Sequence, residues 1–160
     1  MKAILSNKKE IAKGTLWLEF EMEKEVSFKP GQFFYINLKN PPYTDKEGNM
    51  RHFSIVNAPS QKGVIQMATR ITQSAFKRSL YEIPLGSEVD IHDIMGAFLL
   101  PSDSSKHAVF IAGGIGITPF ISMLRHVKEE KLDYNITLFY SNRNKESTAF
   151  YEELQDLNKS

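Results

Sequence analysis

The chain has 160 residues, of which 41% are apolar and 24% are charged, and its formal net charge is +1. This near-neutral balance gives no reason to expect a nucleic acid or a strongly anionic membrane as a partner. The chain contains no cysteine, which excludes disulfide scaffolds, thiol nucleophiles and cysteine-held zinc or iron–sulfur clusters within these residues.

The N-terminal stretch MKAILSNKKE becomes polar after five residues, which is unlike a secretory signal. No apolar run approaches the roughly 18 to 20 residues of a membrane span. We therefore expect a cytoplasmic protein without a membrane span. The four histidines are scattered without metal-ligand spacing, and we expect no metal site.

Apolar residues alternate with polar ones through the first hundred residues. In TLWLEFEM, for example, Leu16, Leu18 and Phe20 face one way while Glu19 and Glu21 face the other. Turn signals separate five such runs, and one helix, SAFKRSLYE at 74–82, interrupts them. The predicted strands are 15–22, 31–38, 51–58, 63–70 and 87–94. Many short strands at this spacing indicate an antiparallel barrel or sandwich.

The pattern changes near residue 105. HAVFIAGG at 107–114 has the apolar run of a strand buried on both faces, and the segment that follows, up to residue 130, contains a helix. Thr118 is the expected N-cap of that helix and Pro119 its first residue. A second buried strand at 135–142 and a second helix at 147–157 complete the order strand, helix, strand, helix, which indicates a parallel α/β unit. The boundary lies in PSDSS at 101–105, giving predicted domains 1–102 and 103–160.

The strand segment RHFS at 51–54 carries unusual side chains for a barrel strand. Arg51 and Phe53 share one face, and His52 and Ser54 share the other. An arginine can bind phosphate bidentately, an aromatic ring can lie on a flat heterocycle, and a serine can hydrogen-bond a ring nitrogen. The alternative is an ordinary strand with a salt-bridged Arg51 and a core Phe53.

The turn GGIGITP at 113–119 lies between a predicted strand and a predicted helix. Its glycines let the backbone turn tightly, and the free N–H groups of the helix start attract anions. This arrangement is typical of a pyrophosphate site, with tight strand–helix packing as the alternative. It is not a P-loop, because no Gly-Lys-Ser/Thr follows.

Together and in this order, the two motifs resemble the ferredoxin–NADP reductase superfamily, in particular its compact bacterial flavin/nicotinamide oxidoreductases. Arg51, Phe53 and Ser54 match its Arg-x-Tyr/Phe-Ser element. The resemblance implies that the arginine binds the flavin pyrophosphate, the aromatic packs on the isoalloxazine, and the serine approaches flavin N5 as the catalytic side chain. The family element Gly-Gly-x-Gly-x-Thr-Pro is matched in full by Gly113, Gly114, Gly116, Thr118 and Pro119.

The resemblance implies further cofactor contacts. In the family, backbone amides at the start of the barrel's helix hold the flavin phosphates. The matching residues are Gln73 and Ser74 at the helix start, and Thr69 and Arg70 on the strand before it. Solvent exposure is the alternative for Arg70.

The third family element, Gly-Pro-x-Gly-x-Phe, is matched only in part. Gly96 and Phe98 are kept, but Ile94 replaces the proline, so the adenine side of the flavin site is less well defined. Arg143 follows a predicted parallel strand at the sheet edge where ligands bind, and is a candidate contact to the nicotinamide cofactor.

The implied fold is an antiparallel Greek-key β-barrel flavin domain followed by the start of a parallel α/β nucleotide-binding domain. The implied function is electron transfer from NADH or NADPH through FAD to a separate one-electron acceptor, such as an iron–sulfur or haem protein. One alternative is a flavin-binding or electron-relay module without NAD(P)H oxidation of its own, and another is a barrel without a cofactor. Because the family's nicotinamide domain has more parallel strands than the two predicted here, we expect an incomplete second domain and a fragment of a longer protein.

Overall fold

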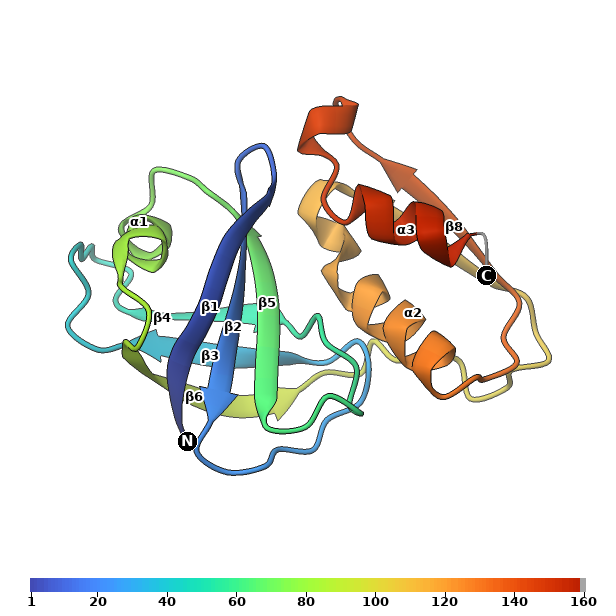
Figure 1. Cartoon of the computed structure of the whole chain (residues 1–160), viewed down its shortest axis with the longest axis horizontal. Coiled ribbons are helices and arrows are strands. Elements are labelled where there is room, and N and C mark those ends of the chain that lie inside the picture. The colour runs from blue at the N-terminus through green and yellow to red at the C-terminus, as the bar shows by residue number, and fades with distance from the viewer. Residues whose placement is uncertain (159–160) are drawn as a thin grey trace.

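Residues 2–95 form six antiparallel strands that curl around one core (Figure 1). The structure is a computed structural model and describes residues 1–158. The strands are β1 (Lys2–Ala12), β2 (Thr15–Met22), β3 (Phe33–Leu38), β4 (Met50–Ser54), β5 (Val64–Arg70) and β6 (Glu88–Met95). Their order in the sheet is β4-β3-β6-β1-β2-β5.

The two ends of this sheet meet beyond the end of β4. The backbone N–H of Val56 donates to the Gln66 carbonyl of β5 over 2.9 Å, which joins the first and last strands of the order. Inside the curl, Leu18, Phe20 and Phe34 have no exposed surface. Helix α1 (Ala75–Glu82) adds Leu80 to the same core. These residues form a complete barrel-like core.

Residues 108–157 form the second half of the chain. Strands β7 (Ala108–Gly113) and β8 (Ile136–Ser141) are parallel. Helices α2 (Thr118–Glu129) and α3 (Tyr151–Leu157) pack on them, with short 3-10 turns η1 (Gly114–Ile117) and η2 (Lys145–Ser147) before them. The predicted fold class, an antiparallel β-barrel followed by a parallel α/β unit, is confirmed. None of the helices formed by residues 1–158 has the length and apolar character needed to cross a membrane.

The barrel strands differ from the prediction at β1 and at β4. Strand β1 was not predicted, because its second half is mostly polar; only Ala3 and Leu5 along it are buried. It pairs with β2 and β6, so its partners and not its own pattern make it a strand. Strand β4 ends at Ser54 and does not continue to residue 58, because residues 55–58 leave β3 and cross, fully buried, toward β5.

The apolar sequences of the two parallel strands predicted burial on both faces, but only one face is buried. On the inner face, Ala108, Phe110 and Ala112 pack against α2 and α3. On the outer face, Ile111 is 77% exposed and Phe139 is 61% exposed. The prediction fails because both helices lie on the same side of the sheet, and no described residue covers the other side.

Candidate functional site

Arg51 and Phe53 meet the first turn of α1. The Arg51 guanidinium lies over the ring of Phe76, with its carbon 5.3 Å from the ring centroid. Phe53 stacks on the same ring, with centroids 6.0 Å apart and planes at 26°. The strand alternation that placed Arg51 and Phe53 on one face is therefore confirmed. Their common partner, Phe76, belongs to a segment 25 residues beyond Arg51.

The start of α1 is built as the sequence predicts. Ser74 is the N-cap, and its side chain accepts from the Lys77 amide over 3.4 Å. The exposed Gln73 precedes it, and the Thr72 hydroxyl donates to the Ser74 oxygen. The amides of Ala75 and Phe76 lie in the first turn, where a helix offers N–H groups without intrahelical acceptors. An anion placed beside them would gain from these donors and from the helix dipole.

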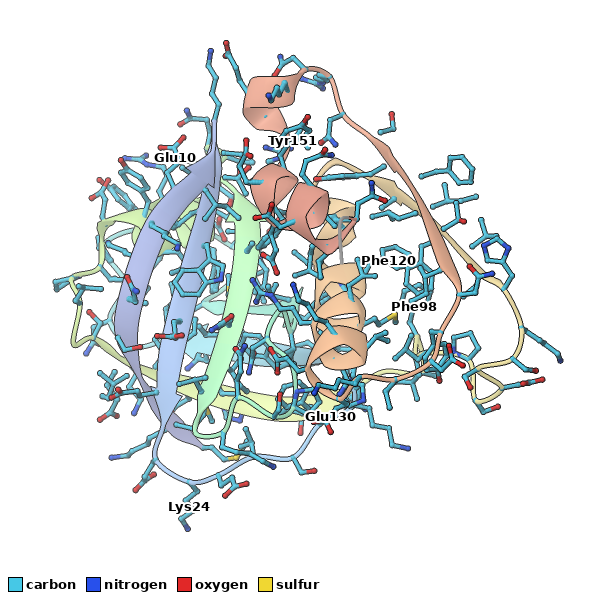
Figure 2. All side chains as sticks on the ribbon, turned by 45° about the vertical axis from the view of Figure 1, so that its right-hand side comes forward. Glu10, Lys24, Phe98, Phe120, Glu130 and Tyr151 are labelled. Atoms are coloured by element: carbon cyan, nitrogen blue, oxygen red, sulfur yellow. The ribbon has the colours of Figure 1, made fainter. Side chains whose placement is uncertain are left out.

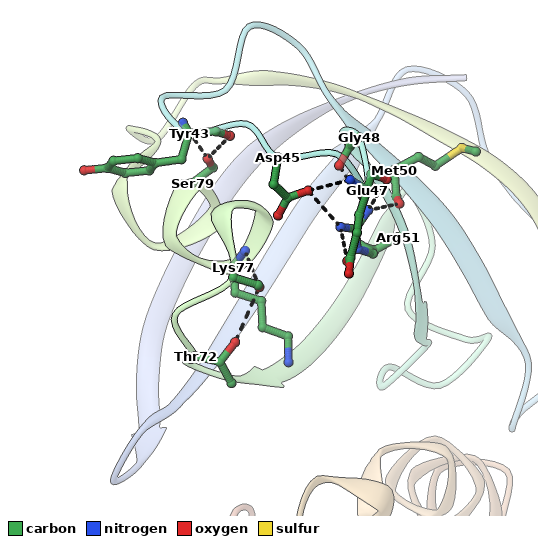
Figure 3. Close-up of polar contacts among 10 residues, drawn as sticks. Tyr43, Asp45, Glu47, Gly48, Met50, Arg51, Thr72, Lys77 and Ser79 are labelled. Carbon is green, nitrogen blue, oxygen red and sulfur yellow. Dashed lines mark hydrogen bonds and ion pairs between the residues drawn. The ribbon is translucent and has the colours of Figure 1, made fainter.

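Lys77 adds a second cation at this helix start (Figure 3). Burial alone lowers the pKa of the Lys77 ammonium, so this cation has lost solvent without gaining an anionic partner among the described residues. An anion bound nearby would offset that cost by pairing with the charge. The start of α1 thus has two features suited to phosphate: the free amides of its first turn, with Arg51 over the Phe76 ring, and the Lys77 ammonium.

Both terminal nitrogens of the Arg51 side chain contact the turn before β4 (Figure 3). Nη1 donates to the carbonyls of Glu47, Gly48 and Met50 over 3.0, 3.0 and 2.7 Å. Nη2 donates to the Glu47 carboxylate over 2.8 Å and lies 3.7 Å from that of Asp45. The ion-paired Arg51 that the sequence left open as an alternative is the arrangement present here.

Ser54 ends β4 on the face opposite to Arg51 and Phe53. Its Cα pairs with that of Phe33, and the residue is half-buried. On the same face, the His52 ring lies 5.6 Å from the rings of both Phe33 and Tyr35. Ser54 therefore stands at the strand end where the chain leaves the sheet.

The end of β5 points toward the second half of the chain. Thr69 is buried, and its hydroxyl donates to the neighbouring Arg70 carbonyl over 3.5 Å. The Arg70 guanidinium donates to the Thr15 hydroxyl and, over 2.8 Å, to the Ser147 carbonyl. Its Nη2 also lies near Gly114, 3.9 Å from where a Cβ would stand. Arg70 is not a solvated side chain; it connects the barrel to η2 beside the Gly-rich turn.

Gly96 and Phe98 are separated from the Arg51 cluster. Gly96 has φ of 123°, and a Cβ there would lie 3.1 Å from the Phe33 ring, so packing against Phe33 requires glycine. Asp93, where the family element has its first glycine, adopts a left-handed φ of 44°. The half-exposed Phe98 meets Phe120 of α2 edge-on, with centroids 5.3 Å apart (Figure 2).

The Gly-rich turn begins its helix earlier than the sequence predicts. β7 ends at Gly113, and the 3-10 turn η1 starts at Gly114, whose φ is 50°. Thr118 is already helical (φ −53°, ψ −47°), and its hydroxyl donates to the Ile115 carbonyl over 3.1 Å. The predicted N-cap role of Thr118 is therefore wrong, because the glycines let the helical turn open four residues sooner. Pro119, predicted as the first helical residue, is the second residue of α2, in its first turn.

Two residues of β8 and its following loop flank this turn. The Tyr140 hydroxyl donates to the Gly114 carbonyl over 3.0 Å, and burial raises its pKa, which keeps the proton in place. Ser141 pairs with Gly113, and Arg143 follows two residues later, exposed at the same carboxyl edge of the sheet. Gly113, Gly114, Gly116 and Arg143 are thus brought to one edge, as predicted for a parallel sheet.

The sequence analysis missed the residues that join the two halves. Wholly buried Asn57 accepts the Gln66 amide through its side chain, and its carbonyl accepts the Ser122 hydroxyl of α2 over 2.7 Å. Arg125 donates to the Val56 carbonyl over 3.2 Å and, bidentately over 2.6 and 2.9 Å, to Glu153 of α3. These contacts start two residues after Ser54, so they fix the position of the RHFS strand relative to α2.

Gly31 is a second omission. Its φ is 96°, and a Cβ there would collide with the Phe98 carbonyl oxygen and the Met123 side chain. The sequence signal, Lys29-Pro30-Gly31, indicated only a turn. The structure shows that this turn touches both the linker after β6 and helix α2.

One large cavity is lined by none of the predicted flavin or nicotinamide contacts. It has a volume of about 1410 Å³ and is lined by Trp17 on the outside of the barrel, Arg125 of α2 and Tyr151 of α3. A second cavity of about 660 Å³ is lined by Leu138, Tyr140 and Asn142. In the described part of the chain, no three carboxylates or histidines are placed to hold a metal ion. The candidate site is therefore the open cluster at β4 and α1, not an enclosed pocket.

Comparison with known families gives two matches that divide the chain. Residues 2–99 match the family described as "Oxidoreductase FAD-binding domain". Residues 110–160 match the family described as "Oxidoreductase NAD-binding domain". The first match alone covers more than half of the chain.

Individual relatives are similar over part of their length. The chain is 33% identical over 105 residues to the carnitine monooxygenase reductase subunit of Escherichia coli K12, covering 64% of this chain and 32% of that protein. It is 29% identical over 153 residues to the phthalate 4,5-dioxygenase oxygenase reductase subunit of Pseudomonas putida, covering 92% and 44%. The chain thus spans between a third and a half of the length of these relatives.

Solved structures share the fold. Phthalate dioxygenase reductase superposes with a TM-score of 0.83 at 23% identity, over 97% of this chain and 47% of that one. The FAD/NAD-binding domain of nitric oxide dioxygenase from Vibrio cholerae gives 0.87 at 16% identity, over 99% and 69%. At these identities the likeness establishes the arrangement of the elements and nothing more.

Proposed function

The chain belongs to the oxidoreductase family with an FAD-binding domain, and from this premise we propose that it transfers electrons from NADH or NADPH through FAD to a one-electron acceptor. The observation that carries the proposal is the cluster at β4 and α1. There, Arg51, Phe53 and the first turn of α1 meet around one aromatic ring.

The cluster fits the phosphates of a flavin nucleotide. A diphosphate needs cations and N–H donors placed together, and Arg51, Lys77 and the Ala75 and Phe76 amides supply them. The lowered pKa of Lys77, caused by burial without an anionic partner, is the mark of a cation that a bound anion would stabilise. These features support FAD as the cofactor and Gln73 and Ser74 as its phosphate-side contacts.

The roles of the other residues follow from their positions. Phe53 offers an aromatic surface beside Arg51, and half-buried Ser54 offers a hydroxyl at the end of the same strand. We assign Ser54 to hydrogen-bonding the reactive edge of the flavin ring, and Thr69, Gly96 and Phe98 to the borders of the flavin site. A bound flavin supplies the redox chemistry, accepting electrons in pairs and releasing them singly, and the protein supplies position and electrostatics.

The nicotinamide cofactor is assigned to the edge of the parallel sheet. Gly113, Gly114, Gly116, Thr118 and Pro119 form its turn there, with Arg70 and Arg143 nearby. We propose residues 1–102 as the flavin domain and 103–160 as the N-terminal part of the nicotinamide domain. The two separate apolar clusters, one inside the barrel and one around α2, support this division.

The electron acceptor is proposed to be a separate iron–sulfur or haem protein. The carnitine monooxygenase and phthalate dioxygenase relatives are named as reductase subunits, which supports a separate partner. We further propose a cytoplasmic location, where NADH and NADPH are supplied; cell fractionation would test it.

The proposal is tested by cofactor content and by turnover. The purified chain should carry or bind a flavin, and chromatography of the flavin released by heat should identify FAD. Mixing the flavin-loaded chain with NADH or NADPH and a dye acceptor then measures electron transfer. Ser54→Ala should retain the flavin and slow its reduction.

The outcomes separate the alternatives. A colourless chain that binds no added flavin would contradict the proposal, and recovery of FMN alone would contradict the choice of FAD. Bound FAD without turnover would favour a flavin-binding or electron-relay module. The uncovered face of β7 and β8, with Ile111 and Phe139 exposed, is the observation that favours this second function for residues 1–160.

A further inference from the structure

Arg51 is enclosed by a short acidic turn that belongs to its own chain. Residues 45–50 wrap around the guanidinium, presenting three backbone carbonyls to Nη1 and the Glu47 carboxylate to Nη2. The Asp45 carboxylate stands 3.7 Å from Nη2. The side chain of Arg51 is only 24% exposed as a result, although it lies at the surface edge of β4.

These contacts use the donors that a phosphate would need. A guanidinium binds phosphate through two neighbouring N–H groups in one plane. Nη1 and Nη2 both already donate to the turn, so a phosphate that binds through the Nη1–Nη2 edge competes with these hydrogen bonds. The contact of the guanidinium carbon with the Phe76 ring, 5.3 Å from the ring centroid, is separate from them. Arg51 can therefore exchange partners without leaving its position.

The two carboxylates also oppose an incoming anion by their charge. A phosphate at Arg51 would lie close to the carboxylates of Glu47 and Asp45, and like charges at such distances repel. Glu47 is the easier of the two to displace, because its side chain is 65% exposed while that of Asp45 is 31% exposed. An exposed ion pair of this kind is weak and breaks readily.

We propose that residues 45–50 are a latch that closes on Arg51 in the free chain and opens when the flavin diphosphate takes the guanidinium. The proposal rests on the proposed flavin site. In it, Glu47 competes with the cofactor for Arg51, so that the native carboxylate lowers flavin affinity. The role of Glu47 is to keep the Arg51 side chain ion-paired and in position when no flavin is bound, and this lowers the affinity for the flavin.

The test is a titration of the flavin-free chain with FAD, followed by quenching of flavin fluorescence. Glu47→Gln keeps the size of the side chain and removes its charge. It should lower the Kd for FAD by about two- to fivefold, the range expected for removing an exposed charge pair. The gain should lie chiefly in the association rate, because the latch exists in the free chain, and stopped-flow mixing would measure it.

Two further variants make the result specific. Glu21→Gln removes the same charge from an exposed position on β2 and should leave the Kd unchanged. In an Arg51→Gln background, Glu47→Gln should have no effect on FAD binding, because the residue for which it competes is gone. Inorganic pyrophosphate alone should also bind the flavin-free Glu47→Gln chain with a lower Kd than the native chain, as measured by calorimetry.

The failures of the two proposals can be told apart. Absence of FAD binding by the native chain and by every variant would overturn the proposed flavin site and the latch with it. Normal FAD binding with an unchanged Kd in Glu47→Gln would overturn the latch alone. A raised Kd would also overturn it, since Glu47 would then be positioning Arg51 for the phosphate and not competing with it.

Discussion

The two halves of the chain differ in how completely their sheets are covered. The barrel sheet joins its own ends through Val56 and Gln66, and its interior includes side chains such as Phe20 with no exposed surface. The parallel pair β7 and β8 has helices on one face and exposed Ile111 and Phe139 on the other. Exposed apolar patches on a sheet mark surfaces that are normally covered by something else.

This difference indicates which contacts stabilise each half. The barrel half contains its own core and the cluster of Arg51, Phe53 and the first turn of α1 that we propose as the flavin phosphate site. The α/β half depends on the barrel, because Trp17 and Ala68 on the outside of β2 and β5 complete its apolar cluster. We therefore expect mutations to separate the halves, with large effects in the barrel core and small effects on the open sheet face.

The largest effect is expected for Phe20→Ala. It removes a wholly buried ring from the barrel core and should lower the free energy of unfolding by about 3 to 5 kcal/mol. Urea unfolding followed by circular dichroism would measure it. Leu85→Ala, at an exposed apolar residue of the same half, is the control and should have little effect. A small cost for Phe20→Ala would mean that the barrel core is not tightly packed.

The second largest effect is expected on ligand affinity, which should also differ between the two halves. Arg51→Ala should weaken FAD binding by about 1.5 to 3 kcal/mol, or roughly ten- to a hundredfold, because a phosphate loses its charge-assisted partner. Arg78→Ala, which removes a cation stacked on Tyr43 of the same region, should leave the affinity near the native value. Equal losses in both variants would show that only general charge matters.

The same contrast predicts weaker binding of the nicotinamide cofactor. The Gly-rich turn is formed, but on a two-stranded sheet with an open face, so NADH and NADPH should bind residues 1–160 much more weakly than FAD. Calorimetry on the flavin-loaded chain would measure this. Micromolar affinity for either nucleotide would show that the two strands suffice, and that the halves are equally complete.

A smaller effect is expected where the halves are joined. Arg125→Ala removes the contacts to Val56 and Glu153, leaving buried acceptors without a donor, and should cost about 1 to 3 kcal/mol. The exposed neighbour Lys128 on α2 is the control, and Lys128→Ala should change stability little. If Arg125→Ala were neutral, the halves would be held by apolar packing alone.

The smallest effect is expected on the open sheet face. Ile111→Thr and Phe139→Thr each change a largely exposed side chain and should alter the free energy of unfolding by no more than about 0.5 kcal/mol. Both should raise the protein concentration at which the chain remains in solution. A loss of several kcal/mol would show that this face is covered in solution, for example by a second copy, which analytical ultracentrifugation would detect.

Features that depend on local spacing could be predicted from the sequence. Period two placed Arg51 and Phe53 on one face of a strand, and the family resemblance placed Ser74 at the start of α1. The Gly-rich turn was also predictable between its strand and helix, because glycine and proline act on the backbone where they stand. These features were enough to predict the fold class and the two motifs of the candidate site.

Contacts between segments that are distant in the sequence are seen only in the tertiary structure. Strand β1 exists because β2 and β6 pair with its polar residues, and Arg70 turns to Ser147 because η2 packs beside the barrel. The apolar pattern of β7 could not show that one of its faces is exposed. An apolar residue favours burial, but its presence does not say whether another segment covers it. Likewise, Asn57 belongs to a predicted strand in the sequence but is a buried link to Ser122 in the fold, because burial is set by neighbours that lie far along the chain.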